Sequence, residues 1–203
     1  MFIRMFAAVA VFASFVACDM ATTPSSESNN PVGPSGVSDP QPTVRTSGTI
    51  SRVAGGSNVI INMLDNCDRD TFDAVIGPGT CVRNGGMKFD QFIAQLTRLG
   101  FVGSWHFSRP VANARVGQSL LVTNRGGEVH TFTEVEEFGG GIVANLNELA
   151  GVPNVAPECL SLAAGDFVAP GGTFTDTEDE EGNEKYQCCI HPWMRLDLHV
   201  TEK

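Results

Sequence analysis

The sequence predicts an all-β fold, an antiparallel Greek-key β-sandwich with a small helical insert. Short runs of alternating apolar and polar residues recur along the chain, and turn signals rich in Gly and Pro separate them. One amphipathic stretch, at about residues 70–99, interrupts this pattern. A chain of 203 residues with 42% hydrophobic composition can bury one core of ordinary size. We therefore expect a single sandwich domain over residues 47–203.

Residues 1–18 predict an export signal. One Arg precedes an unbroken run of small and apolar residues, which is too short to remain as a membrane span. The run ends in Phe-Val-Ala-Cys, which is similar to a bacterial lipoprotein signal in which Cys18 becomes the lipidated N-terminal residue. Simple cleavage near Ala17 or Ala21 is the alternative. Either way, we expect an exported domain, periplasmic or at the cell surface, where disulfides persist.

Residues 19–46 are rich in Pro, Ser, Thr, Asn and Gly and contain almost no large apolar side chains. Such a segment cannot bury enough surface to offset its ordering entropy. We expect it to be a flexible tether.

The domain begins with a strand and two helices. The run V-I-I-N-M-L predicts a strand after the turn signal Gly55-Gly56. Asp70 or Thr71 is expected to cap a short helix that Gly77-Pro78-Gly79 ends. A clearer helix is predicted from about Lys88 to Leu99, with Gly100 as its end signal. Its apolar face, which we expect to pack on a sheet, carries Phe89, Phe92, Ile93, Leu96 and Leu99.

Two later stretches alternate as strands do. Residues 111–124 predict two strands joined at Gly117-Gln118, and residues 194–201 show a clean period of two. In the second stretch His199 falls on the polar face, which favours an exposed side chain. His106 has no motif around it and is also expected at the surface.

Residues 186–194, Y-Q-C-C-I-H-P-W-M, carry the clearest chemistry of the chain. They place a thiolate (Cys188), an imidazole (His191) and a thioether (Met194) within seven residues. These donors suit a soft, redox-active metal, and copper is the first candidate. A further ligand must come from elsewhere, and among the 4 histidines of the chain His130, in G-G-E-V-H-T-F, is best placed.

At this point the sequence resembles the cupredoxins, the type 1 blue copper family, of the amicyanin and plastocyanin kind. Residues 107–132 are similar to the family's strand, V-x-x-G turn, strand and first His ligand. Residues 182–200 resemble its final hairpin, with the short Cys-x-x-His-x-x-Met loop of amicyanin. Two features depart from the family: Thr131 stands where members often have Asn, and the segment between the two blocks is longer.

The resemblance implies a ligand set and a function. His130 and His191 would be the imidazole ligands of one type 1 copper per chain, Cys188 the thiolate and Met194 the axial ligand. The implied function is that of an exported carrier of single electrons between redox partners, and not of an enzyme. Copper storage or delivery, or a structural zinc site on the same ligands, are the alternatives.

The cysteine count tests the ligand choice. Setting Cys18 aside leaves five cysteines, so at least one thiol stays unpaired and a metal ligand is its natural role. Cys67 and Cys81 close a local loop and are expected to pair. Because successive strand residues point to opposite faces, Cys188 and Cys189 cannot both face the metal, which leaves Cys189 to reach Cys159. Two alternatives stay open: a vicinal Cys188–Cys189 bridge, and Cys189 as the ligand.

Charge and histidine content exclude several classes of function. A formal net charge of −10 argues against nucleic acid or an anionic membrane surface as the partner. The negative charge favours a basic redox protein of the cytochrome c kind as the partner. We expect contact with a membrane only through a lipid anchor, and we expect the chain to be a monomer. The acidic run D-T-E-D-E-E-G-N-E at 176–184 predicts either a solvated loop or a docking surface for that partner.

Copper enzymes need more than this chain offers. Four histidines cannot supply the catalytic coppers of a multicopper oxidase or a nitrite reductase. A dinuclear purple-copper site needs two ligand cysteines spaced by three residues, whereas Cys188 and Cys189 are adjacent.

Overall fold

A computed structural model describes residues 57–202. The predicted export signal, the lipidation site Cys18 and the predicted tether lie outside these residues. Within residues 57–202, none of the helices combines the length and the hydropathy that a membrane span requires.

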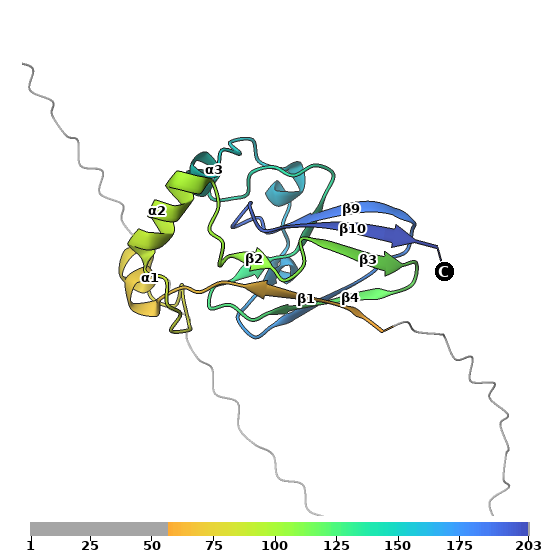
Figure 1. Cartoon of the computed structure of the whole chain (residues 1–203), viewed down its shortest axis with the longest axis horizontal. Coiled ribbons are helices and arrows are strands. Elements are labelled where there is room, and N and C mark those ends of the chain that lie inside the picture. Colours follow the sequence, from red (N-terminus) through yellow and green to blue (C-terminus); the bar gives the residue numbers. More distant parts are fainter. Residues whose placement is uncertain (1–56, 203) are drawn as a thin grey trace, which may run out of the picture. The chain divides into compact units, whose positions relative to one another are not determined.

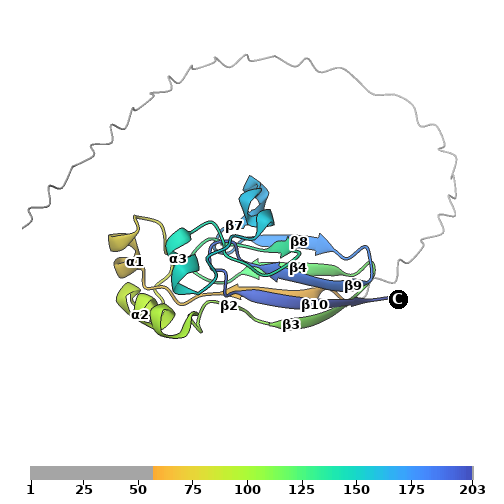
Figure 2. The same ribbon diagram turned by 90° about the horizontal axis from the view of Figure 1, so that it is seen from above.

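The described chain is mostly β-sheet, in two four-stranded sheets and one short strand pair (Figures 1 and 2). The first sheet has the order β2 (His106–Phe107), β1 (Val59–Leu64), β4 (Ser119–Asn124) and β8 (Thr173–Thr177). The second has the order β3 (Val111–Arg115), β10 (Arg195–Thr201), β9 (Gly182–Gln187) and β6 (Thr133–Val135). The short pair joins β5 (His130–Thr131) to β7 (Phe167–Val168).

Both four-stranded sheets are mixed, so the expectation of purely antiparallel sheets is wrong in two places. Strand β1 runs parallel to β4, and β3 runs parallel to β10. The other strand pairs are antiparallel. Strands β3 and β4 follow one another in sequence but enter different sheets, and the chain turns between them at Gly117, whose φ is 81°. Alternation predicts which face of a strand is buried, but not which strand lies beside it.

Apolar side chains of both sheets share one core. Along β10, Leu196, Leu198 and Val200 are buried while His199 is exposed, as the alternation predicts. Phe132, which follows β5, stacks on Tyr186 of the second sheet with ring centroids 4.4 Å apart. The same ring meets Phe107 of the first sheet at 5.3 Å. Aromatic contacts of this kind fix the position of the residues beside them, including His130.

The two helices of the insert form where the sequence predicts them, with two differences. Helix α2 (Phe89–Leu99) ends at Gly100, whose φ is 77° and whose N–H donates to the Leu96 carbonyl at 2.7 Å. Leu99, however, is 43% exposed instead of lying on the buried face. Helix α1 (Arg69–Val75) is capped earlier than expected, by Asp68, whose side chain accepts from the Thr71 N–H at 3.1 Å.

The helices gather at one end of the sheets, opposite the end where the described chain finishes (Figures 1 and 2). An aromatic cluster packs them there: the Phe72 ring lies 5.5 Å from that of Phe92 and 5.8 Å from that of Trp105. The sequence did not predict the remaining short helices, α3 (Ala144–Leu149), η1 (Pro157–Leu160) and η2 (Ala164–Asp166).

Two disulfides link segments that are separated in the sequence. Cys67 is bonded to Cys81 and Cys159 to Cys189, which are the pairs that the sequence analysis proposed. The vicinal bridge does not form, because Cys188 is free and buried. The second disulfide closes a separation of 30 residues, so it ties the segment after β6 to the residue beside Cys188.

A glycine run lets this segment approach the backbone of Cys189. The Ile142 N–H donates to the Cys189 carbonyl at 2.7 Å. A Cβ on Gly141 would lie 1.9 Å from that same oxygen, which leaves no room for any side chain. The close contact therefore requires glycine at position 141.

We predict that Gly141→Ala destabilises the fold. The methyl group must push the Cys189 backbone away, and overpacking of this kind costs about 1–3 kcal/mol. Denaturant unfolding measures the loss. The control is Gly165→Ala, where an added Cβ meets nothing within 4 Å. Equal free energies of unfolding for the two variants would contradict the packing argument.

Candidate metal centre

The ligand loop, residues 188–194, connects β9 to β10 at the end of the second sheet. Strands β9 and β10 pair up to Arg195 and Gln187, so Cys188 emerges directly from a held strand. Its N–H donates to the Met194 carbonyl at 3.0 Å, and the Met194 N–H donates to the His191 carbonyl at 2.9 Å. These two bonds fix the three residues relative to one another.

The short pairing of β5 with β7 places His130 beside this loop. His130 lies opposite Val168 in the ladder. The Nδ1 atom of His130 is 3.8 Å from the Cys188 sulfur, and the Nδ1 atom of His191 is 3.9 Å from it. One ligand atom from each of the three residues lies within 4.8 Å of the others. The structure thus brings together residues that lie 58 positions apart in sequence.

The other residues singled out by the sequence divide into two groups. Met194 is fully buried in the ligand loop. His106 and His199 are exposed and lie outside the group of three donors.

Thr131 takes part in the hydrogen bonding around the sulfur. Its backbone N–H donates to the Cys188 sulfur at 3.4 Å, and its hydroxyl accepts from the Cys189 N–H at 2.7 Å. Thr131 therefore forms hydrogen bonds with both Cys188 and Cys189. Although it stands where cupredoxins often have Asn, it still holds the start of the loop in place.

The sulfur and the first imidazole shift each other's pKa. Burial alone would raise the pKa of Cys188, but hydrogen bonds and positive charge from His130 and His191 hold it well below its usual range. Burial alone would lower the pKa of His130, but its hydrogen bonds to Asp65 and Cys188 raise it to about 9. Each group thus shifts the pKa of the other toward its charged form, the thiolate of Cys188 and the imidazolium of His130.

A buried carboxylate lies behind His130, and the sequence analysis missed it. The Nε2 atom of His130 is 3.0 Å from Oδ2 of Asp65, and neither side chain is more than 1% exposed. The Gly127 and Glu128 N–H groups also donate to this carboxylate, at 2.8 and 3.0 Å. Burial would raise the pKa of Asp65, but these hydrogen bonds together lower it.

A second carboxylate lies behind His191. Oε2 of Glu128 accepts from the Trp105 indole N–H at 2.6 Å and lies 3.6 Å from Nε2 of His191. Burial raises the pKa of Glu128, although the charge of His191 and the Trp105 hydrogen bond act against it. Each imidazole therefore faces the sulfur with Nδ1 and a carboxylate with Nε2.

Three aromatic rings cover His191. The centroids of Trp193, Phe92 and Trp105 lie 5.5, 6.4 and 6.4 Å from that of the imidazole. His191 is consequently only 3% exposed, and Cys188 and His130 are fully buried. Helix α2 contributes Phe92, so the helical insert forms part of the wall of this centre.

The donor set fits a transition metal ion. The thiolate is the form of cysteine that binds metal, a lowered pKa favours it, and imidazole nitrogens suit both copper and zinc. The same loop also carries the thioether of Met194, and soft sulfur ligands select copper.

Comparison with known proteins gives structural similarity only. No family model matches the chain, and no curated protein matches it. A purple cupredoxin from Nitrosopumilus maritimus is similar at 15% identity and a TM-score of 0.39, over 71% of this chain and 100% of that chain. The Cu(I) form of an amicyanin variant is similar at 20% identity and a TM-score of 0.33, over 47% and 73%. The oxidised form of another amicyanin variant is similar at 14% identity and a TM-score of 0.35, over 74% and 88%.

We predict that Cys188 in the metal-free chain stays ionised well below pH 8.5, the ordinary pKa of a thiol. Substitution of His130 by Gln removes a hydrogen bond and a positive charge that favour the thiolate, so the pKa of Cys188 rises. Ultraviolet absorbance of the thiolate, followed against pH with Cys188→Ser as the blank, measures this. His199→Gln, at an exposed position, should leave the midpoint unchanged. A midpoint that is the same in His130→Gln and in the unaltered chain would contradict the pairing.

Proposed function

We propose that the chain is an exported type 1 copper protein of the cupredoxin kind, which carries single electrons between redox partners. One observation carries this proposal: the Cys188 sulfur and the Nδ1 atoms of His130 and His191 meet in a buried site. Cys188, His130 and His191 would hold one copper ion per chain, with Met194 as the axial ligand. We propose that the chain is a carrier and not an enzyme.

The chain's own contribution is to hold its donors still. Copper, when bound, supplies a one-electron couple. Strand β9, the bonds within the ligand loop and the β5–β7 ladder fix the donors from three directions. A site held by its scaffold changes little between two oxidation states, which keeps the reorganisation that accompanies electron transfer small.

The fold and the compartment belong to the same proposal. We propose that the two mixed sheets are a variant of the Greek-key cupredoxin sandwich, with the residues of α1 and α2 as an insert. Two disulfides support export to the periplasm or the cell surface, because such bonds persist in oxidising compartments. Attachment to a membrane through a lipid on Cys18 completes the proposal.

The partner in this proposal is a basic redox protein, and the chain acts as a monomer. The net charge of −10 supports a cationic partner through electrostatic steering. The acidic turn at 178–181, however, lies at the far end of β9 from Cys188. Six strand residues separate them, a distance of about 20 Å. Glu178 of this turn is also buried, with only 3% exposed. The steering therefore comes from the overall charge more than from a docking surface on this turn.

A visible absorption spectrum of the purified chain loaded with Cu(II) tests the function. We expect the intense blue band of a Cu(II)–thiolate bond, which a zinc site does not give. Binding of Zn²⁺ with no such band after copper loading would favour the structural zinc alternative. A blue protein that exchanges no electrons with a cationic redox protein would favour copper storage or delivery.

We predict that the two adjacent cysteines respond differently to substitution by Ser. Cys188→Ser removes the thiolate and should abolish the blue band while leaving both disulfides intact. Cys189→Ser should keep the band and lower the free energy of unfolding by roughly 3–4 kcal/mol, because it opens the Cys159 disulfide. Loss of colour in Cys189→Ser alone would show that Cys189 is the ligand.

A further inference from the structure

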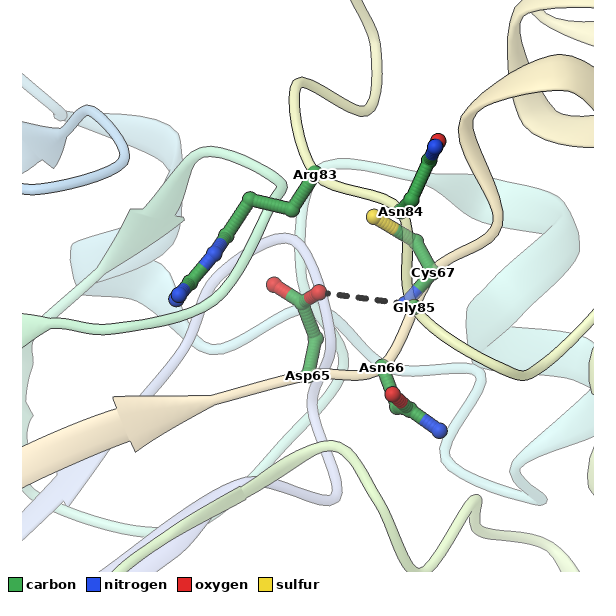
Figure 3. Close-up of a pocket in the computed structure, with 6 residues that line it drawn as sticks. All are labelled: Asp65, Asn66, Cys67, Arg83, Asn84 and Gly85. Atoms are coloured by element: carbon green, nitrogen blue, oxygen red, sulfur yellow. Dashed lines mark hydrogen bonds between the residues drawn. The ribbon is translucent and has the colours of Figure 1, made fainter.

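Asp65 lies between His130 and a hollow at the surface. The residue follows β1 directly, and its neighbours line a hollow of about 270 Å³ together with Arg83, Asn84 and Gly85 (Figure 3). Oδ1 of Asp65 accepts from the Cys67 N–H at 3.3 Å, the bond that is drawn there. Although it borders this hollow, the side chain is only 1% exposed, because the loop before His130 wraps around the carboxylate.

The hydrogen bond to Asp65 determines which nitrogen of His130 faces the sulfur. A carboxylate accepts but does not donate, so Nε2 of His130 must carry the hydrogen. Nδ1 is then the nitrogen that would give up its proton to a metal, and it is the atom that lies 3.8 Å from Cys188. Flipping the imidazole ring would break the bond to Asp65 and turn Nδ1 away.

The two glycines before Glu128 pack directly against the Asp65 carboxylate and the Cys67–Cys81 disulfide. A Cβ on Gly126 would lie 1.9 Å from Oδ2 of Asp65, and one on Gly127 would lie 2.6 Å from the Cys67 sulfur. The Val82 N–H also donates to the Gly127 carbonyl at 2.8 Å. The loop is therefore built for close contact with Asp65.

Glu128 does not form the corresponding hydrogen bond to His191. Its oxygen is 3.6 Å from Nε2, beyond the ordinary range of a hydrogen bond, and it bonds to Trp105 instead. Of the two carboxylates behind the imidazoles, only Asp65 is bonded directly to one of them.

We propose that Asp65 is a positioning residue of the metal centre. It orients His130 and favours binding of the metal in its more highly charged oxidation state. Carboxylates hydrogen-bonded to ligand histidines fix ring orientation and raise ligand basicity. A negative charge held close to the site also stabilises Cu(II) more than Cu(I), by Coulomb attraction. The copper part of this inference rests on the proposed function, whereas the orientation of His130 applies to any metal bound there.

The test compares Asp65→Asn with Asp90→Asn, which removes the same charge at an exposed position on α2. Zn²⁺ affinity is measured by competition with a chelator, and we expect it to fall about 10- to 100-fold in Asp65→Asn only. For copper, we expect the ratio of Cu(II) to Cu(I) affinity to fall at least about tenfold. This ratio corresponds to a rise of about 59 mV in the one-electron reduction potential.

A second variant keeps the test decisive if Asp65→Asn does not fold. Gly126→Ala retains the carboxylate but displaces it, so Zn²⁺ affinity should fall here too, while Gly103→Ala, where a Cβ meets nothing within 4 Å, should match the unaltered chain. Unchanged Zn²⁺ affinity in Asp65→Asn or, if that variant does not fold, in Gly126→Ala would overturn the inference. Equal losses in Asp65→Asn and Asp90→Asn would also overturn it.

The same experiment separates this inference from the proposed function. If the unaltered chain binds Zn²⁺ but gives no Cu(II)–thiolate band, the proposed function fails, and the Zn²⁺ comparison still decides the role of Asp65. If the unaltered chain binds neither metal, both are overturned.

Discussion

The buried contact of the Cys188 sulfur with two imidazoles is the interaction on which the rest of this end of the molecule depends. A thiolate without water around it is costly unless opposite charge and hydrogen-bond donors compensate for it. His130 compensates the charge of the Cys188 thiolate, and Asp65, on the other side of the ring, compensates the charge of His130. Negative, positive and negative groups thus alternate through the interior, and each requires its neighbour to be held within about 4 Å.

The helical insert is a structural part of the centre and not only a cover on the sheet. The segment that leaves β1 carries Asp65, then Cys67, then α1, so the first disulfide anchors the carboxylate as well as the helix. Helix α2 brings Phe92 against His191, and the following loop brings Trp105, which orients Glu128. Changes made far along the sequence from Cys188 can therefore alter its surroundings.

The parts of the centre that could be predicted from sequence are those with a local signal. Cys188, His191 and Met194 lie within seven residues, and α2 has a regular apolar period and a glycine at its end. Asp65 and Glu128 have no such signal, since the bonds of Asp65 to Gly127 and His130 span 62 and 65 positions and acidic residues are common on surfaces. The two glycines before Glu128 were the available hint, because adjacent glycines mark close approach of other groups. The parallel strand pairs escaped prediction because alternation specifies faces and not neighbours.

The burial of the three donors has a consequence for how an ion would enter the site. Cys188 and His130 have no surface accessible to water or free ions while the ligand loop and the Phe92, Trp105 and Trp193 rings are in place, and His191 has only 3%. Uptake must pass through a transiently open form of the loop, so its rate is set by local opening and not by the affinity of the finished site. The same barrier slows escape. A metal enclosed during folding in the exported compartment would remain kinetically trapped, and the identity of the occupant would then record which ion was present when the loop closed.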